Sequence, residues 1–225
     1  MKIGKYKGKL KVLKGKVPIP KMKEDVESIL DSKALMDELF NYLMSTKQDY
    51  GIMWLMGAKR YLDDKKERLK SPFSGHLDRG HLVEVELFRH FNKELTFIHP
   101  AVILYESLLN WVIIAPISTG KYCTGDDFHI DVDENDGLRH QSAICLNDIR
   151  AIDKNRILYQ HSKEGQNVKV QSITLDKIDQ VLIEKIMPVT YKRYCELEIA
   201  LEQEKRNHSK TILELEVLKS KLVVN

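Results

Sequence analysis

The sequence has no apolar run that approaches the length needed to cross a membrane, which is about 20 residues for a helix. Its N-terminus is rich in lysine and lacks the apolar segment of a signal peptide. We therefore expect a cytoplasmic protein that does not enter a membrane. With 225 residues, of which 43% are hydrophobic, the chain is long enough for one domain of ordinary size with helical additions.

Cysteine is scarce and shows no pairing pattern. The three cysteines, Cys123, Cys145 and Cys195, lie far apart and include no CxxC pair. An odd number at such spacing indicates neither a disulfide framework nor a zinc site. It is typical of a protein that stays in a reducing compartment.

Acidic residues are absent from positions 1–23, which contain nine lysines. The rest of the chain holds 27 basic and 33 acidic residues and therefore carries a net charge of −6. We call residues 1–23 the basic arm. Such a block either is a solvated tail or adds a salt-dependent, sequence-independent contribution to RNA binding. Lysine and apolar residues alternate over positions 1–16, which favours a short basic strand.

Residues 24–70 are predicted to form a helical hairpin. Apolar residues recur at helical spacing from Leu35 to Met44, which gives a wide apolar face. A second apolar surface runs from Ile52 to Leu62, with Trp54 as a large anchor. We expect the two faces to pack within the chain, with capture of a partner helix as the alternative.

Residues 80–120 carry the pattern of a three-stranded antiparallel meander. Apolar residues from Leu82 to Leu87 are set among Glu84 and Glu86, close to the alternation of a half-buried strand. Two further apolar runs, at 101–105 and 111–117, are separated by a turn. Pro100 is expected to open the second strand, where its missing N–H disrupts no ladder bond.

A further strand is predicted over residues 127–133. It places His129, Asp131 and Asp133 on one face. This pattern is unspecific, so a metal site stands beside a solvated face or a salt-bridging edge as an interpretation. Another strand is expected over residues 141–146 after an Asn-Asp-Gly turn.

Three segments carry a resemblance to a known family. Residues 99–104 (HPAVIL) and 115–119 (APIST) resemble the arginine-proline and proline-x-threonine strands of MazF/PemK-type toxins, the ribosome-independent endoribonucleases of toxin–antitoxin systems. Residues 142–156 (SAICLNDIRAIDKNR) are similar to the family's serine-led strand and the IR-x-IDK-x-R turn that follows it. The resemblance spans residues 79–187.

The resemblance implies a mainly β core in the form of a small SH3-like barrel of the CcdB/PemK type. Together with the flanking patterns it predicts four parts: the basic arm at 1–23, a helical hairpin at 24–70, the barrel domain at 79–187 and a long helix at 190–223. Helical spacing of apolar residues over 175–186 fits the family's C-terminal helix, which Pro188 interrupts.

The resemblance also implies a metal-independent ribonuclease that needs no cofactor. In this reaction the ribose 2′-OH attacks the adjacent phosphate and leaves a 2′,3′-cyclic phosphate and a 5′-OH. The chemistry requires a base, an acid and donors around the phosphorane oxygens. The matched positions offer His99, Ser118, Thr119 and Ser142 as catalytic candidates.

His99 departs from the family pattern, which has an arginine before that proline. Neutral imidazole presents one donor and one acceptor, while guanidinium is a permanent five-donor fork. Histidine can, however, exchange protons near neutral pH. His99 is therefore either a general acid or base, with Ser118 and Thr119 holding the phosphate, or a structural histidine in a catalytically inactive homologue.

Basic residues near the matched strands are the predicted contacts for RNA phosphates: Arg89, Lys93, Lys121, Arg139 and His140. Single-stranded RNA is the expected target, because its bases can splay and stack on aromatic side chains such as Phe91, Phe97 or Tyr122. The resemblance further implies a homodimer and a cognate antitoxin peptide that occupies the RNA groove.

Residues 190–223 are predicted to form one long amphipathic helix. Its leucines fall on a coiled-coil pattern at 197, 201, 215, 218 and 222, but the same seam passes through Glu204, His208 and Thr211. Self-association as a coiled coil and binding of a different protein both fit this pattern.

Two other functions are compatible with the predicted barrel. A non-catalytic protein on this fold would act through protein or nucleic-acid interaction, using the His99 departure and the helical extensions. A gyrase poison is the third reading, and the matched segments fit the nuclease branch better.

Overall fold

The computed structural model describes residues 3–66, 73–88 and 94–223. These form two compact units, one before and one after residues 67–72. Among these residues, no helix combines the length and apolar character that a membrane crossing requires.

The first unit is entirely helical, with α1 at Ile3–Leu13, a 3₁₀ turn η1 at Met22–Glu24, α2 at Val26–Ser45 and α3 at Gln48–Lys65. The expected strand in the basic arm is wrong, because α1 is a helix. Its Lys9 pairs with Asp25 at 2.6 Å and Glu27 at 2.8 Å, and the Tyr6 hydroxyl donates to Asp31 at 2.6 Å. Positions 6 and 9 lie one helical turn apart, so helix formation brings both onto the acidic start of α2.

The apolar faces of α2 and α3 remain largely exposed. Exposed fractions are 56% for Met36, 60% for Phe40 and 58% for Leu55, while Leu43 is buried. The faces expected to pack within the chain therefore stay open in this unit.

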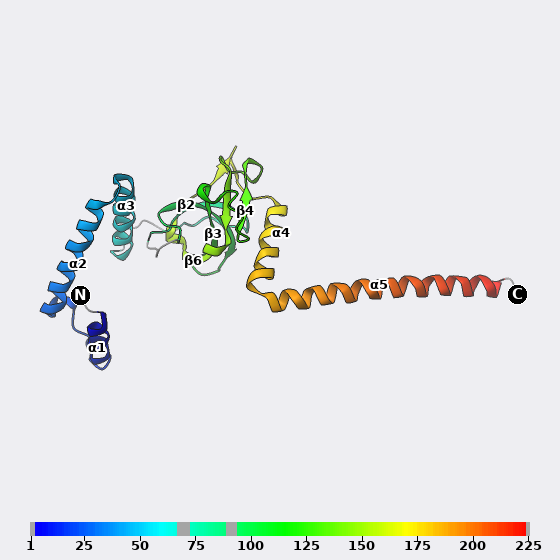
Figure 1. Ribbon diagram of the computed structural model, residues 1–225, viewed down its shortest axis with the longest axis horizontal. Coiled ribbons are helices and arrows are strands. Elements are labelled where there is room, and N and C mark those ends of the chain that lie inside the picture. Colours follow the sequence, from blue (N-terminus) through cyan, green and yellow to red (C-terminus); the bar gives the residue numbers. More distant parts are fainter. Residues whose placement is uncertain (1–2, 67–72, 89–93, 224–225) are drawn as a thin grey trace. The chain divides into compact units, whose positions relative to one another are not determined.

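The second unit is built on a seven-stranded antiparallel sheet (Figure 1). Its strands are β1 Leu82–Glu86, β2 Ile98–Glu106, β3 Trp111–Ser118, β4 His129–Val132, β5 Ser142–Cys145, β6 Arg150–Asp153 and β7 Ile157–Gln160. The order is β4-β5-β3-β2-β1-β7, with β6 also pairing β3. A small hairpin follows, β8 Ser162–Lys163 and β9 Gln166–Asn167. Four 3₁₀ turns lie between strands: η2 Thr119–Lys121, η3 Glu134–Asp136, η4 Leu146–Asp148 and η5 Lys154–Arg156.

The predicted meander is confirmed by the antiparallel pairing of β1 with β2 and of β2 with β3. Pro100 is the third residue of β2 rather than its first. It is tolerated there because pairing with β3 begins only at Ala101, so Pro100 has a neighbouring strand on one side alone.

The mainly β core between helical segments is confirmed. Within the described residues, however, β4 and β7 end the strand order and do not pair with each other, so hydrogen bonds do not close the sheet into a barrel.

Strand alternation divides the core between the two faces of the sheet. Val83, Val85 and Ile103 belong to one buried cluster. Leu82, Val102 and residues of the neighbouring strands belong to the other, which Ile178 of helix α4 completes. Both clusters are fully buried at their centres, and each such side chain contributes about 1.5–3 kcal/mol.

Three helical segments end the chain: α4 at Ser172–Val181, a π-helical turn η6 at Leu182–Ile186 and α5 at Pro188–Val223. Helix α4 lies beside β4, and α5 is one uninterrupted helix (Figure 1). The expected break at Pro188 is confirmed, since proline fits the first turn of a helix.

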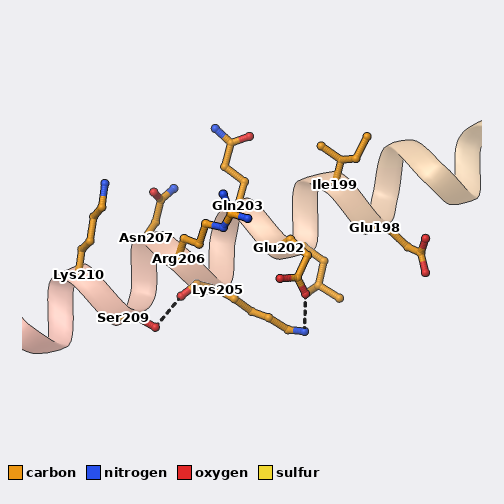
Figure 2. A pocket seen from close by; sticks show the side chains of 10 residues that line it. Glu198, Ile199, Glu202, Gln203, Lys205, Arg206, Asn207, Ser209 and Lys210 are labelled. Atoms are coloured by element: carbon orange, nitrogen blue, oxygen red, sulfur yellow. Dashed lines mark hydrogen bonds and ion pairs between the residues drawn. The ribbon is translucent and has the colours of Figure 1, made fainter.

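The surface of α5 has no cavity of its own. Figure 2 shows part of it, where all the side chains drawn come from this single helix and include the Glu202–Lys205 ion pair. Its seam residues Leu197, Leu201 and Leu218 are each more than half exposed, and side chains from position 220 onward, including that of Leu222, lie outside the described residues. The coiled coil stays a prediction.

Candidate functional site

A cleft of about 730 Å³ opens on the second unit. It is formed by the start of β2, the turn after β3, the loop into β5 and the segment from β7 to β9. The residues that line it are Pro100, Thr119, Glu134, Gly137, Leu138, Arg139, His140, Ser142, Tyr159, Gln160, His161, Ser162, Lys163 and Val168. We call this space the cleft.

The loop from β4 to β5 forms one wall of the cleft and is shaped by local hydrogen bonds. Asp133 accepts from the amide of Asn135 at 2.8 Å, which caps the turn η3. Gly137 then takes φ +81°, a conformation that suits glycine.

Asp136, in the same wall, is buried and turns its carboxylate toward α4. It accepts hydrogen bonds from the Gln171 amide at 3.0 Å and from the Thr174 hydroxyl at 2.7 Å. The wall is thereby fixed to the first turn of α4, since each bond to a charged acceptor contributes about 1.5–3 kcal/mol.

Pro100 and Tyr159 of the cleft lining belong to a row of residues across three paired strands. Glu84 of β1 lies opposite Pro100 of β2 and opposite Tyr159 of β7. Residues opposite one another in neighbouring strands share a face of the sheet. This register brings residues more than 50 positions apart to one place.

Four of the predicted site residues line the cleft: Thr119 and Ser142 among the catalytic candidates, and Arg139 and His140 among the RNA contacts. Ser142 is buried, and its hydroxyl donates to the His140 carbonyl at 3.0 Å. The turn after β3 and the start of β5 therefore supply two hydroxyl groups to one space.

Three other predicted residues do not line the cleft. His99 lies opposite Val85, and strand alternation places it on the other side of β2 from Pro100. Ser118 precedes Thr119 and is paired with Ala143 at the end of β3. Lys121 is half-buried at the end of η2.

Arg89, Lys93 and Phe91 lie outside the described residues. Phe97 is buried, at 7% exposure, so it belongs to the core rather than to a base-stacking surface.

The segment from β7 to β8 supplies cleft residues that sequence reasoning missed. His161 Nε2 lies 2.9 Å from Glu84 Oε2, and the two side chains are 28% and 15% exposed. The rings of Tyr159 and His161 are tilted, with centroids 5.3 Å apart. No motif marks these residues; the available signal was a run of polar and aromatic side chains (YQHSK) at the end of a strand.

The backbone of His161 is held on both sides. Its amide donates to the Leu82 carbonyl at 2.9 Å, and its carbonyl accepts from the Val168 amide at 2.9 Å. The side chain therefore projects from a fixed point of the fold.

Metal ligation gains no support from the described parts of the chain, where no three His, Cys, Asp or Glu side chains gather at one point. On β4, His129 Nδ1 lies 2.6 Å from the Thr124 hydroxyl, and Asp131 accepts from the Cys123 amide at 3.0 Å. Nδ1 of His129 and Oδ1 of Asp131 thus have local partners.

Cysteine chemistry is also disfavoured near the cleft. Burial raises the pKa of Cys145, on β5, to about 11. Its thiol is therefore protonated near neutral pH, and the thiolate is the nucleophilic form.

The cleft combines groups that suit a phosphodiester. Arg139 and Lys163 are cations, Thr119 and Ser142 carry hydroxyls, and His140 and His161 can exchange protons. Glu134 is the acidic member of the lining, so the cleft carries a modest positive charge.

Comparison with known proteins agrees with this arrangement. Residues 78–187, just under half of the chain, match the sequence model of a family described as PemK-like, MazF-like toxin of type II toxin-antitoxin system. No curated protein matches the chain.

Several solved structures are similar to about half of this chain. Mycobacterium tuberculosis toxin MazF-mt6 is 16% identical, with 46% of this chain and 93% of that chain covered and a TM-score of 0.35. MazF from Deinococcus radiodurans is 18% identical, with 50% of this chain and 98% of that chain covered and a TM-score of 0.40. The match to MazE–MazF from Deinococcus radiodurans is 17% identical, with 48% of this chain and 94% of that chain covered and a TM-score of 0.37.

The family match covers all the strands of the second unit, the whole cleft and helix α4, and it confirms the resemblance found in the three sequence segments. Residues 78–187 are thus similar to the PemK-like, MazF-like toxin family, and helical segments precede and follow this part of the sequence.

Proposed function

We propose that the protein is a toxin-like endoribonuclease that cleaves single-stranded RNA in the cleft without a metal. The observation that carries the proposal is the convergence of Thr119 and Ser142, from two separate motif segments, with Arg139, His140 and His161 around one space of about 730 Å³. Convergent polar groups in one concave site are the usual sign of a functional centre.

RNA would bind through its backbone and one exposed aromatic ring. Arg139 and Lys163 contact phosphates, which positions the strand without reading its sequence. Tyr159 is 53% exposed and offers a surface on which a base can stack, worth about 1–3 kcal/mol.

In the proposed reaction the 2′-OH attacks the neighbouring phosphorus and forms the O2′–P bond, while the P–O5′ bond breaks. The hydroxyl groups of Thr119 and Ser142 and the guanidinium of Arg139 donate to the phosphorane oxygens, once the Ser142 hydroxyl has turned away from the His140 carbonyl. A base takes the 2′ proton, and the departing 5′ oxygen gains one. The products are a 2′,3′-cyclic phosphate and a 5′-OH.

His99 keeps its place in the proposal as a candidate for this proton transfer. It lies one residue from Pro100, which lines the cleft. Its position across the strand means that it would act at the rim rather than inside.

The description of the matched family supports a proposed antitoxin partner. We propose that a cognate antitoxin peptide inhibits the enzyme by occupying the cleft, where acidic side chains would meet Arg139 and Lys163. A homodimer is part of the same proposal.

A catalytically inactive binding protein is the second candidate. The observation in its favour is the substitution of His99 for the family's arginine, together with the exposed apolar faces of α2 and α3.

The test is incubation of the purified protein with a long single-stranded RNA in EDTA, beside Ser142→Ala and Thr119→Val. We expect site-limited cleavage that leaves cyclic phosphate ends and falls by about 10²-fold or more in each variant. Lys163→Gln serves as a comparison, because it should weaken RNA binding more than the chemical step. Intact RNA with every substrate would favour the binding protein.

A further inference from the structure

We infer that His161, oriented by Glu84, is the proton-transfer residue of the cleft. This inference rests on the proposed function and adds to it a residue pair that lies outside the matched motif segments. It starts from the contact between His161 Nε2 and Glu84 Oε2 at 2.9 Å.

The contact fixes which ring nitrogen is available. An ionised carboxylate can only accept hydrogen bonds, so Nε2 carries the proton that it donates to Glu84. Nδ1 is then the unprotonated nitrogen of the neutral ring, with a lone pair for a substrate proton. A carboxylate behind a histidine also stabilises the imidazolium once that proton has been taken.

The position of the pair supports a role in the cleft. His161 is a lining residue and is 28% exposed, while Glu84 behind it is 15% exposed and is not in the lining. The histidine therefore faces the cleft, and the carboxylate is shielded between it and the sheet. This order, with the reacting group outside and its orienting partner inside, is typical of a general base.

The charged and titratable groups that line the cleft with His161 come from two segments. Tyr159 and Lys163 lie on its own segment, and Glu134, Arg139 and His140 lie on the facing loop. Lys163 and Arg139 attract a phosphate to the space beside the imidazole, which would bring a 2′-OH within its reach.

Nδ1 of His161 takes the 2′ proton as the O2′–P bond forms, and the P–O5′ bond breaks with its electron pair on the 5′ oxygen. That oxygen takes a proton from water, and the imidazolium returns its proton to the hydroxide so formed. No metal, oxidant or reductant enters the step.

The experiment compares single-turnover cleavage by wild type, His161→Asn, Glu84→Gln, Glu84→Asp and His99→Asn across about pH 5–8, the range in which histidine titrates. RNA affinity is measured in parallel on a strand with 2′-O-methyl groups, which cannot be cut. Circular dichroism of each variant reports folding.

We expect His161→Asn to lower the cleavage rate by about 10²-fold or more, with the affinity for methylated RNA within about twofold of wild type. Glu84→Gln should move the acidic limb of the pH–rate profile, and Glu84→Asp should restore much of the activity. A purely structural pair would alter folding or affinity and leave the shape of the profile unchanged.

The outcomes separate the two proposals. Cleavage by wild type together with wild-type activity of folded His161→Asn overturns the role of His161 and leaves the ribonuclease intact. Loss of activity only in His99→Asn assigns the proton transfer to His99. An absence of cleavage by wild type overturns the proposed function and this inference with it.

Discussion

Glu106, the last residue of β2, is a junction of charges at the edge of the core. Its carboxylate accepts from Lys154 Nζ at 2.5 Å and from the Leu77 amide at 3.1 Å, and His76 Nδ1 lies 2.8 Å away. Burial acts to raise the pKa of Glu106, but the hydrogen bonds from Lys154 and Leu77 and the nearby positive charges outweigh it and leave the pKa below its usual value.

This shift predicts a pH-dependent contribution to stability. Because the folded-state pKa is depressed, the charged carboxylate stabilises the fold above the unfolded-state pKa, and the gain is lost as the pH falls through the folded-state value. Glu106→Gln should therefore lower the free energy of unfolding by about 2 kcal/mol at neutral pH, and the deficit should shrink in acid.

Urea unfolding at neutral and acidic pH checks this prediction. The control is Glu164→Gln, because Glu164 is exposed in the β8–β9 turn and should change stability little at either pH. An equal loss at both pH values for Glu106→Gln would contradict the assignment.

Individual residues of the site could be predicted from the sequence where a motif contains them. Thr119 and Ser142 belong to sequence segments with a recognisable order of residues, and both line the cleft. His161 has no motif, and its partner Glu84 is 77 positions away. Only the pairing of β1 with β7 brings these two together, and a single sequence does not show which distant strands are neighbours.

At the scale of elements, Gly137 shapes the wall of the cleft. It has φ +81°, and a Cβ added there would lie 2.2 Å from Val168 Cγ1. Gly165, in the β8–β9 turn, also has φ +81° but open space around it. The two glycines share a backbone conformation and differ in their surroundings.

Substituting each of these two glycines by alanine gives a matched test of the steric clash at position 137. Both Gly137→Ala and Gly165→Ala should lose about 1–2 kcal/mol of stability from the left-handed conformation, and Gly137→Ala should lose more because Val168 must move. Thermal unfolding of both variants measures the difference. Equal losses would mean that the wall adapts without cost, and a smaller loss at Gly137 would contradict the clash.

Elements were predictable where one apolar pattern decided them. The helical spacing in α4 matched the observed structure because Ile178 and its neighbours place one face of this helix on the core. The strand β1 was predicted correctly, although it is buried on both faces rather than half-buried. The basic arm was misjudged because its alternation is weak and its helix is held by Asp25, Glu27 and Asp31 of α2. Long-range ion pairs of this kind leave no local trace in the sequence.

At the scale of the whole molecule, the arm and the family domain lie in different units. Lys5 and Lys9 of the arm are engaged by Glu27 of α2. The other arm lysines that the structure describes are exposed: Lys7, Lys11, Lys14, Lys16, Lys21 and Lys23. A chain that lacks residues 1–23 should therefore bind single-stranded RNA with a shallower dependence on salt. The slope should fall by about 0.7 for each lysine that contacts a phosphate.

Titrations of methylated RNA at several salt concentrations test this expectation. A full-length chain with glutamine in place of the arm lysines other than Lys5 and Lys9 is the matched control and should behave like the truncated chain. An unchanged slope in both would identify the arm as a solvated tail.

The carboxylate of Asp136 connects two parts of the second unit that have different roles. The loop around it forms a wall of the cleft, and the amide of Gln171 that it holds begins α4. That amide can exchange its hydrogen with solvent only when the loop and the helix separate. Occupation of the cleft should therefore slow hydrogen exchange at the start of α4, so a ligand can be detected at a position that it never touches.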